Sequence, residues 1–217
     1  MFRTHTQLIG ALLVGSLACF SVAQAQTASP ADAQNAQSEV PATAHATVSL
    51  ISDELLAMLG DAKTRFNEDP QAFYADIDAV IAPWIDFDSW TRGVMGEYFG
   101  KASEAQLQAF AETFRRSLIE TYAKGLINVN DGSYEIDPPR EGDEAKISVG
   151  VRQKIHSGSE DVDVAYNMVK NDSGRWQIKN ALLDGVSLGP VFRSQFKGAM
   201  EDSDGDITHT CFQIRNI

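Results

Sequence analysis

The sequence predicts an α+β domain in which N-terminal helices pack on a curved antiparallel sheet. Apolar and polar residues alternate over 147–152, 162–168 and 176–179, as in strands that expose one face to water. Turn-rich joins at 156–159 and 171–174 separate these runs and favour a meander. Apolar residues at helical spacing precede the strands, so helices must cover the apolar face of the sheet.

The N-terminus has the pattern of a secretory signal peptide over residues 1–25. Arg3 precedes an apolar run over 8–22, and Ala23-Gln24-Ala25 forms a small-x-small cleavage site. The run is short for a membrane span, and we expect a periplasmic protein. A lipoprotein anchored at Cys19 fits less well, because Leu17 stands one place from the position that such a signal requires.

Residues 26–44 predict a flexible leader, because they are rich in Ala, Gln, Ser and Thr and lack large apolar side chains. The chain of 217 residues is long enough for one domain with a core, and its net charge is −12. Nucleic-acid binding requires a basic surface, so this charge argues against it.

Two amphipathic helices are expected next, over 48–59 and 70–81. Asp69 followed by Pro70 is a helix start signal, and Pro83 marks the end of the second helix. Ser103 with Gln106 forms a capping box for the longest expected helix, which continues to Leu126.

The aromatic segment over 84–99 is interrupted by Gly93 and Gly96 and followed by Gly100, which predicts short helices. These helices either close one end of the core or form a mobile lid, with the glycines permitting movement.

The apolar strand face leaves two interpretations open, an ordinary core and a ligand pocket, because periodicity cannot distinguish them. No residue on the expected inner face carries a full charge, so a pocket there would suit hydrocarbon.

The segment after the last long strand resembles the MlaC family, periplasmic phospholipid-binding proteins of the Mla intermembrane transport system, also described as toluene-tolerance proteins. The resemblance rests on the strand beginning at Trp176, on Gly185-Val186-Ser187-Leu188 and on Arg193-Ser194-Gln195-Phe196. Upstream, Asp86-Phe87 precedes a short Trp-containing helix. The likeness covers residues 45–200, and the tail over 201–217 is atypical of the family.

The resemblance implies a cone-shaped NTF2-like fold whose apolar cavity holds the acyl chains of a phospholipid. The implied function is a soluble periplasmic carrier that maintains outer-membrane lipid asymmetry. It would shuttle lipid between an outer-membrane lipoprotein–porin complex and an inner-membrane ABC transporter complex with a membrane-anchored ring component. We expect a monomer that is not an enzyme and needs no cofactor other than bound phospholipid.

Eighteen residues are predicted to contact the lipid: Trp90, Val94, Tyr98, Phe110, Phe114, Leu118, Ile147, Val149, Val151, Val162, Val164, Tyr166, Met168, Trp176, Ile178, Val186, Leu188 and Phe192. Arg193 is a candidate for the headgroup phosphate, because guanidinium groups suit phosphate geometry. A solvated surface arginine or a structural ion pair is the alternative for Arg193.

Two other functions remain open, namely an NTF2-like enzyme acting on a small hydrophobic substrate and a ligand-free envelope adaptor. The sequence contains no recognisable catalytic motif, and Tyr166 is the only titratable residue on the expected inner strand face. The candidate metal ligands His45, His156 and His209 are far apart in sequence, so no metal site is expected.

Overall fold

The computed structural model describes residues 40–127, 132–157 and 160–213, within a compact unit that spans Val40–Ile217. The expected signal peptide over 1–25 and the leader up to residue 39 lie outside the described residues. The last leader residues join the domain, because the indole Nε1 of Trp176 donates a 3.1 Å hydrogen bond to the carbonyl oxygen of Ala42. Thr43 then caps the first helix.

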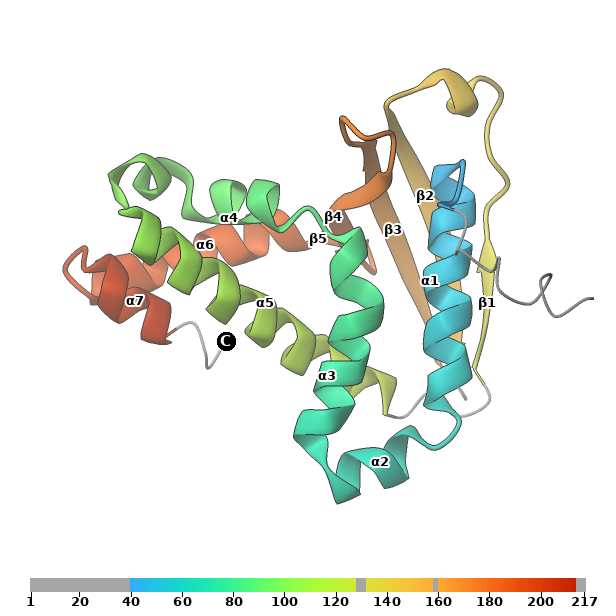
Figure 1. Ribbon diagram of the computed structural model, residues 1–217, viewed down its shortest axis with the longest axis horizontal. Coiled ribbons are helices and arrows are strands. Elements are labelled where there is room, and N and C mark those ends of the chain that lie inside the picture. Colours follow the sequence, from blue (N-terminus) through green and yellow to red (C-terminus); the bar gives the residue numbers. More distant parts are fainter. Residues whose placement is uncertain (1–39, 128–131, 158–159, 214–217) are drawn as a thin grey trace, which may run out of the picture. The chain divides into compact units, whose positions relative to one another are not determined.

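Three helices open the domain: α1 (Ala44–Leu59), α2 (Ala62–Glu68) and α3 (Pro70–Ile81). The side chain of Asp69 accepts hydrogen bonds of 3.0 Å from the backbone N–H groups of Gln71 and Ala72. Together with Pro70 at the first position, this cap begins α3 where the sequence predicts. In Figure 1 the helices α1 and α3 run alongside the sheet.

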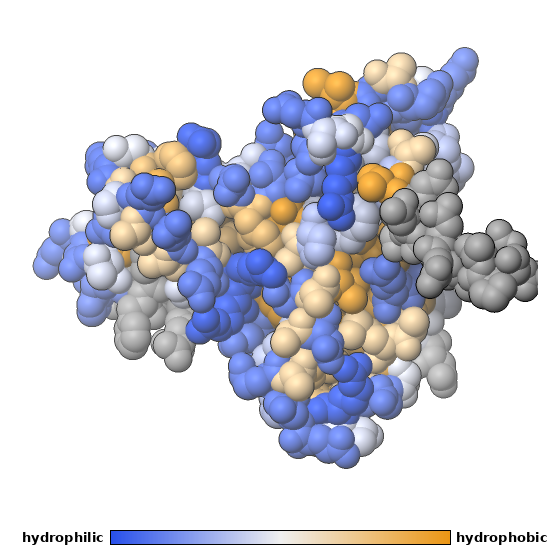
Figure 2. Space-filling model, in the orientation of Figure 1, coloured by the Kyte–Doolittle hydropathy of each residue, from blue (hydrophilic) through white to orange (hydrophobic). Residues whose placement is uncertain are grey.

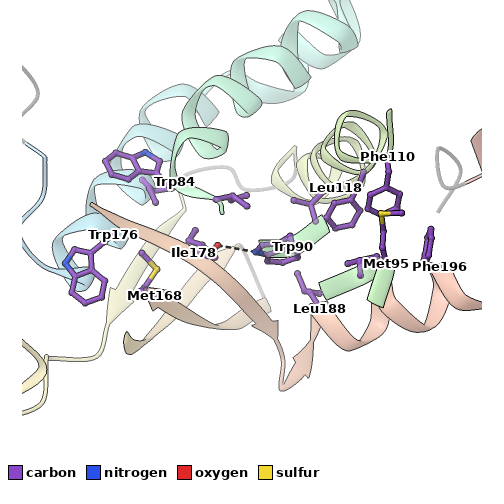
Figure 3. Close-up of a cluster of buried hydrophobic side chains, with 14 of the residues drawn as sticks. Trp84, Trp90, Met95, Phe110, Leu118, Met168, Trp176, Ile178, Leu188 and Phe196 are labelled. Atoms are coloured by element: carbon purple, nitrogen blue, oxygen red, sulfur yellow. Dashed lines mark hydrogen bonds between the residues drawn. The ribbon is translucent and has the colours of Figure 1, made fainter. Parts of the chain in front are cut away.

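The aromatic segment forms the short helices η1 (Ala82–Trp84), α4 (Phe87–Met95) and η2 (Gly96–Lys101). The longest helix, α5 (Glu104–Leu126), begins with the capping box of Ser103 and Gln106, which confirms that prediction. The indole Nε1 of Trp90 donates a 3.1 Å hydrogen bond to the carbonyl oxygen of Ile178, which ties α4 to the sheet (Figure 3).

The sheet confirms the predicted antiparallel meander, and its five strands are in the order β1-β2-β3-β4-β5. The strands are β1 (Ser133–Ile136), β2 (Ser148–Ser157), β3 (Glu160–Lys170), β4 (Trp176–Leu183) and β5 (Val186–Ser187), with the short helix η3 (Asp143–Ala145) before β2. The sheet is open, and its edge strands β1 and β5 are four and two residues long. The mixture of helices and antiparallel sheet is therefore the fold class that the sequence predicts.

A bulge in β4 changes which residues face the helices. Met168 of β3 pairs with Ile178, whereas the preceding Asn167 pairs with Asn180, so Lys179 is an additional residue on β4. After the bulge Ala181, rather than Asn180, continues the apolar face that begins with Trp176 and Ile178.

The chain ends in two helices, α6 (Leu188–Asp202) and α7 (Ile207–Gln213). The sequence indicates an atypical tail over 201–217, whereas the structure contains a short helix whose Ile207 belongs to the main core. Thr208 accepts a 3.1 Å hydrogen bond from the Gln106 side chain on α5. Figure 1 shows α4, α5, α6 and α7 grouped beside one another, away from α1.

Candidate ligand pocket

An apolar pocket of about 330 Å³ lies between the inner face of the sheet and helices α3 and α5. Its lining comprises Leu55, Ile77, Ile81, Ile85, Trp90, Leu118, Ile119, Tyr122, Ala123, Gly125, Leu126, Ile155, Val162, Val164, Tyr166, Ile178, Ala181, Leu183 and Leu188. Figure 2 shows hydrophobic residues at the surface in the middle of this face, around α3 and between α3 and α1. The helices therefore do not plug the apolar face of the sheet completely.

The sheet forms one wall of the pocket because alternate residues of neighbouring strands point to the same face. Val164 of β3 pairs with Leu183 of β4, and both side chains line the pocket. Tyr166 pairs with Ala181 one step further along, and these two residues also line it. This wall is apolar except for the phenol of Tyr166.

The hydroxyl of Tyr166 begins a chain of hydrogen bonds that runs from the sheet to α1. It donates to Oε1 of Gln153 at 2.8 Å, and Nε2 of Gln153 donates to Oγ of Ser52 at 2.6 Å. Ser52 in turn donates to the carbonyl oxygen of Val48 at 2.8 Å. Gln153 is buried, and alternation along β2 places it on the same strand face as Val149 and Val151, although it is not among the predicted contacts.

The pocket has little capacity for acid–base chemistry. Among the described residues that line it, Tyr122 and Tyr166 are the only ones that titrate. Burial raises the pKa of both phenols, so both hydroxyls stay protonated near neutral pH. No group of three or more potential metal ligands occurs among the described residues. The described helices are also too short or too polar to cross a membrane.

Seven of the predicted lipid contacts line the pocket. They come from both helices and strands: Trp90, Leu118, Val162, Val164, Tyr166, Ile178 and Leu188.

Five other predicted contacts are packed in the core and do not line the pocket: Phe110, Val149, Val151, Met168 and Trp176. Figure 3 shows Met168 and Trp176 near Trp84 on one side of Trp90, and Phe110 near Phe196 on the other side. At these five positions the side chains are packed against other members of the main core cluster, which favours the core interpretation there.

The predicted contacts Val94, Phe114 and Phe192 lie between α4, α5 and α6, in or against the same main core cluster as Trp90. They line a cavity of only about 10 Å³, which is roughly the space of one water molecule. The ring of Phe192 lies 5.1 Å from that of Phe114, and the ring of Tyr98 lies 5.9 Å from that of Phe196. These residues do not line the pocket, although the ring of Phe192 lies 6.4 Å from the rings of the lining residues Trp90 and Tyr122.

Two further predicted contacts, Ile147 and Val186, have exposed side chains and do not line this pocket. Ile147 precedes the first residue of β2 and is 75% exposed, and Val186 in the two-residue edge strand β5 is 56% exposed.

Arg193 also lies away from the pocket. It is exposed on α6, and its Nη2 atom lies 2.9 Å from where a Cβ atom on Gly96 would stand. Gly96 has a positive φ of 53°, so a side chain there would be strained and would displace the guanidinium. Its exposure fits both a surface arginine and a contact to a headgroup in water, so the role of Arg193 stays a prediction.

Several lining residues were absent from the predicted set although the sequence carried a signal for them. Ile77 and Ile81 belong to the apolar stripe of α3, and Tyr122 and Leu126 continue the stripe of α5 beyond Leu118. Ala181 was not predictable by alternation, because the bulge at Lys179 shifts the register of β4.

Comparison with known proteins identifies one family and several relatives. The family model described as MlaC protein matches residues 50–213. The toluene tolerance protein ttg2D of Pseudomonas putida is 31% identical over 169 residues, which cover 77% of this chain and 78% of that protein. The intermembrane phospholipid transport system binding protein MlaC of Haemophilus influenzae is 23% identical over 139 residues, covering 63% of this chain and 65% of that protein.

A solved structure has the same fold. The phospholipid-binding protein of Ralstonia solanacearum, determined in complex with a phospholipid, superposes with a TM-score of 0.71 at 26% identity. The match covers 79% of this chain and 94% of that chain.

Proposed function

The chain belongs to the MlaC family, and we propose that it is a periplasmic carrier that binds a phospholipid in the pocket between the sheet and helices α3 and α5. The observation that carries the proposal is this apolar space of about 330 Å³, which the helices leave unfilled. Its volume lies in the range of small-molecule pockets. The acyl chains would occupy it, and the headgroup would remain in water.

The energetics suit a carrier rather than a permanent binder. Two acyl chains contain on the order of 30 methylenes, and their transfer from water would contribute roughly 20–25 kcal/mol at about 0.8 kcal/mol each. In a bilayer those chains are already out of water, so exchange into an apolar pocket is close to neutral. The direction of net transfer must then come from partner proteins or from ATP hydrolysis elsewhere.

We further propose that the carrier exchanges lipid with an outer-membrane lipoprotein–porin complex and an inner-membrane ABC transporter complex with a membrane-anchored ring component. This transport would maintain the lipid asymmetry of the outer membrane. The name of the Haemophilus influenzae relative, a binding protein of an intermembrane phospholipid transport system, supports this part of the proposal.

An enzymatic function is less well supported by the same pocket. Its two phenols have pKa values raised by burial, and neither can act as a general base near neutral pH. We therefore propose binding and release of intact lipid, without a chemical step.

Organic extraction of the purified protein followed by mass spectrometry tests the proposal. We expect about one phospholipid for each protein molecule, and uptake of lipid again when delipidated protein is incubated with phosphatidylglycerol vesicles. Protein that is folded, contains no extractable phospholipid and takes none from vesicles would contradict the carrier function. Recovery of a small polar ligand instead would favour an enzyme.

A further inference from the structure

We propose that the free part of the edge of β2, at Ser148 and Gly150, binds an extended peptide segment of a partner protein that carries an acidic side chain. The segment would join the sheet as a further strand beside β2. In this mode of recognition the backbone hydrogen bonds supply affinity and the side-chain contacts supply specificity. The inference goes beyond the proposed lipid binding, because this edge does not line the apolar pocket.

Strand β2 is longer than the strand that covers its outer edge. It contains ten residues and pairs along its whole length with β3, whereas the four residues of β1 pair only with 153–156. One further bond of 3.0 Å joins the backbone N–H of Asp137 to the carbonyl oxygen of Arg152. The next two residues after Asp137 are prolines, which have no N–H group and cannot continue the pairing. The first part of β2 therefore has no neighbouring strand on this side.

The alternation of hydrogen bonds shows which backbone groups of β2 point to the free edge. The carbonyl oxygen of Ile147 accepts a 2.8 Å bond from Lys170, so odd-numbered residues bond to β3 in this antiparallel pair. Even-numbered residues face the opposite side, as the bond that Arg152 accepts there shows. The backbone groups of Ser148 and Gly150 therefore point to the edge. They have no hydrogen-bond partner within the part of the chain that the structure describes.

A hollow of about 310 Å³ lies along this edge. Gly150 and Arg152 line it from β2. Arg140 lines it from the connection between β1 and β2, and the half-buried His45 lines it from the start of α1. Figure 1 shows this connection turning back beyond the upper end of α1. The hollow therefore gives an added backbone access to the free groups of Gly150.

The charges around the hollow favour an acidic occupant. Arg140 and Arg152 are exposed, and neither forms an ion pair with another of the described residues. Of the two carboxylates in the lining, that of Asp143 is already bound by Nζ of Lys146 and by the backbone N–H of Arg140, each at 2.9 Å. One carboxylate, that of Asp137, is left for two guanidinium groups. In a chain of net charge −12, this local positive excess selects an acidic side chain over a basic one.

The chemistry of the edge favours a peptide over a free anion. A phosphate group mainly accepts hydrogen bonds, so it would leave the carbonyl oxygens of Ser148 and Gly150 unpaired. A peptide backbone supplies donors and acceptors in alternation and can pair with both kinds of group. Ile147, at the start of this edge, is 75% exposed, and a side chain of an added strand would pack against it.

Titration with short peptides, followed by the amide chemical shifts of the protein in NMR spectra, tests the inference. The peptides Thr-Val-Glu-Val-Thr, Thr-Val-Gln-Val-Thr and Thr-Val-Lys-Val-Thr, with blocked ends, consist mainly of strand-forming residues and differ in one side chain. With the Glu peptide at millimolar concentration we expect saturable shifts at Ser148, Gly150 and Arg152. The Glu peptide should bind about threefold more tightly than the Gln peptide, and the Lys peptide more weakly than both.

Gly150→Pro and Gly150→Thr form a matched pair of variants. Proline removes the N–H group that points to the edge, without removing a bond to β3, so we expect the peptide-induced shifts to disappear. Threonine keeps the N–H group, and its Cβ would find no atom within 4 Å, so the peptide should still bind. Both variants should take up phospholipid as the wild type does, because Gly150 does not line the apolar pocket.

Arg152→Gln and Lys154→Gln test the contribution of charge. Arg152 lines the hollow, and its loss should reduce the threefold preference for the Glu peptide over the Gln peptide to about twofold or less. Lys154 is the next residue on the same face of β2, but its Nζ lies 3.5 Å from the carboxylate of Asp163 and it does not line the hollow. Lys154→Gln should therefore keep the wild-type preference.

The outcomes separate this inference from the carrier function. The inference is overturned if none of the three peptides shifts the amides of Ser148 and Gly150, if all three bind equally well, or if folded Gly150→Pro binds as the wild type does. If Gly150→Pro does not fold, an unchanged preference in Arg152→Gln overturns it instead. A dimer in sedimentation experiments that Arg152→Gln dissociates would make a second copy of this chain the occupant and overturn the assignment to a partner. Wild-type protein that binds the Glu peptide but takes up no phospholipid would refute the carrier function and support the inference.

Discussion

Two valines of the sheet show that burial alone does not identify a ligand contact. Val149 and Val164 face the same side of the sheet and are 4% and 5% exposed. Val164 lines the pocket, whereas Val149 is enclosed by other side chains of the core. Both valines belong to the same alternating pattern in the sequence. This pattern shows which face of the sheet a residue occupies, but it does not show where the helices cover that face, so it cannot distinguish a pocket residue from a core residue.

Charged substitutions at these two positions should therefore have different effects, one on stability and the other on bound lipid. In Val149→Asp the carboxylate is buried without a partner, and we expect a loss of stability of about 3 kcal/mol or more. In Val164→Asp the carboxylate borders the pocket, so we expect a folded protein with little bound phospholipid. Urea unfolding and lipid extraction measure the two effects.

Val186→Asp is the control for that pair, because Val186 is exposed and does not line the pocket. It should retain both stability and lipid. A folded Val164→Asp protein that keeps the wild-type lipid content would contradict the assignment of the pocket.

Tyr166 should also give the protein a pH dependence in the alkaline range. Burial raises the pKa of its phenol in the folded state above the value of about 10 in the unfolded chain. The folded state keeps the proton where the unfolded state loses it, so this contribution to stability is complete below pH 10 and decreases as pH rises above it.

We expect the free energy of unfolding of the wild type to fall above pH 10 more steeply than that of Tyr166→Phe. The difference in slope should approach about 1.4 kcal/mol per pH unit for the one proton involved. Urea unfolding at a series of alkaline pH values measures both slopes. Identical slopes would show that this phenol is not protected from deprotonation.

Among the helices and strands, the sequence predicted the starts of two helices correctly from their capping residues, but it did not predict the last helix of the domain. The caps at Asp69 and Ser103 are where the sequence predicts them, because capping depends on a few adjacent residues. The helix over Ile207–Gln213 was not predicted, because its stability comes from packing against distant parts of the chain, such as Gln106.

The packing of α7 is testable at Ile207, which is buried in the main core. We expect Ile207→Ala to lower the free energy of unfolding by about 2 kcal/mol, at the low end for a buried isoleucine because Ile207 begins a helix of only seven residues. Asp202→Ala, at an exposed position on α6, should change it by less than about 0.5 kcal/mol. Equal effects of the two substitutions would mean that α7 does not contribute to the core.

For the whole molecule, composition and pattern predicted the fold class and the inner sheet face, but not the extent of the cavity. Whether an apolar face is covered depends on where α3 and α5 cross the sheet. The crossing positions follow from long-range packing, as at Ile77 and Leu126, and not from the local pattern. The bulge at Lys179 is a second feature of this kind, because it redirects the end of β4 without a distinct local signal.

The net charge of −12 is a property of the whole molecule, and it predicts an electrostatic attraction between the protein and its partners. We expect its association with the proposed membrane complexes to involve basic patches on their surfaces. The association rate should then fall as salt rises from low to physiological concentration, where the screening length is about 8 Å. Surface plasmon resonance at several salt concentrations measures this rate, and a salt-independent rate would argue against electrostatic attraction.

The short edge strands of the open sheet have a consequence for a protein that repeatedly collides with its own copies. Unpaired backbone groups on a long edge can recruit another chain and start a fibril. Here the edge strands β1 and β5 are only four and two residues long, and β1 carries the charged Glu135. These two strands themselves thus offer few backbone groups with which another copy of the protein could pair.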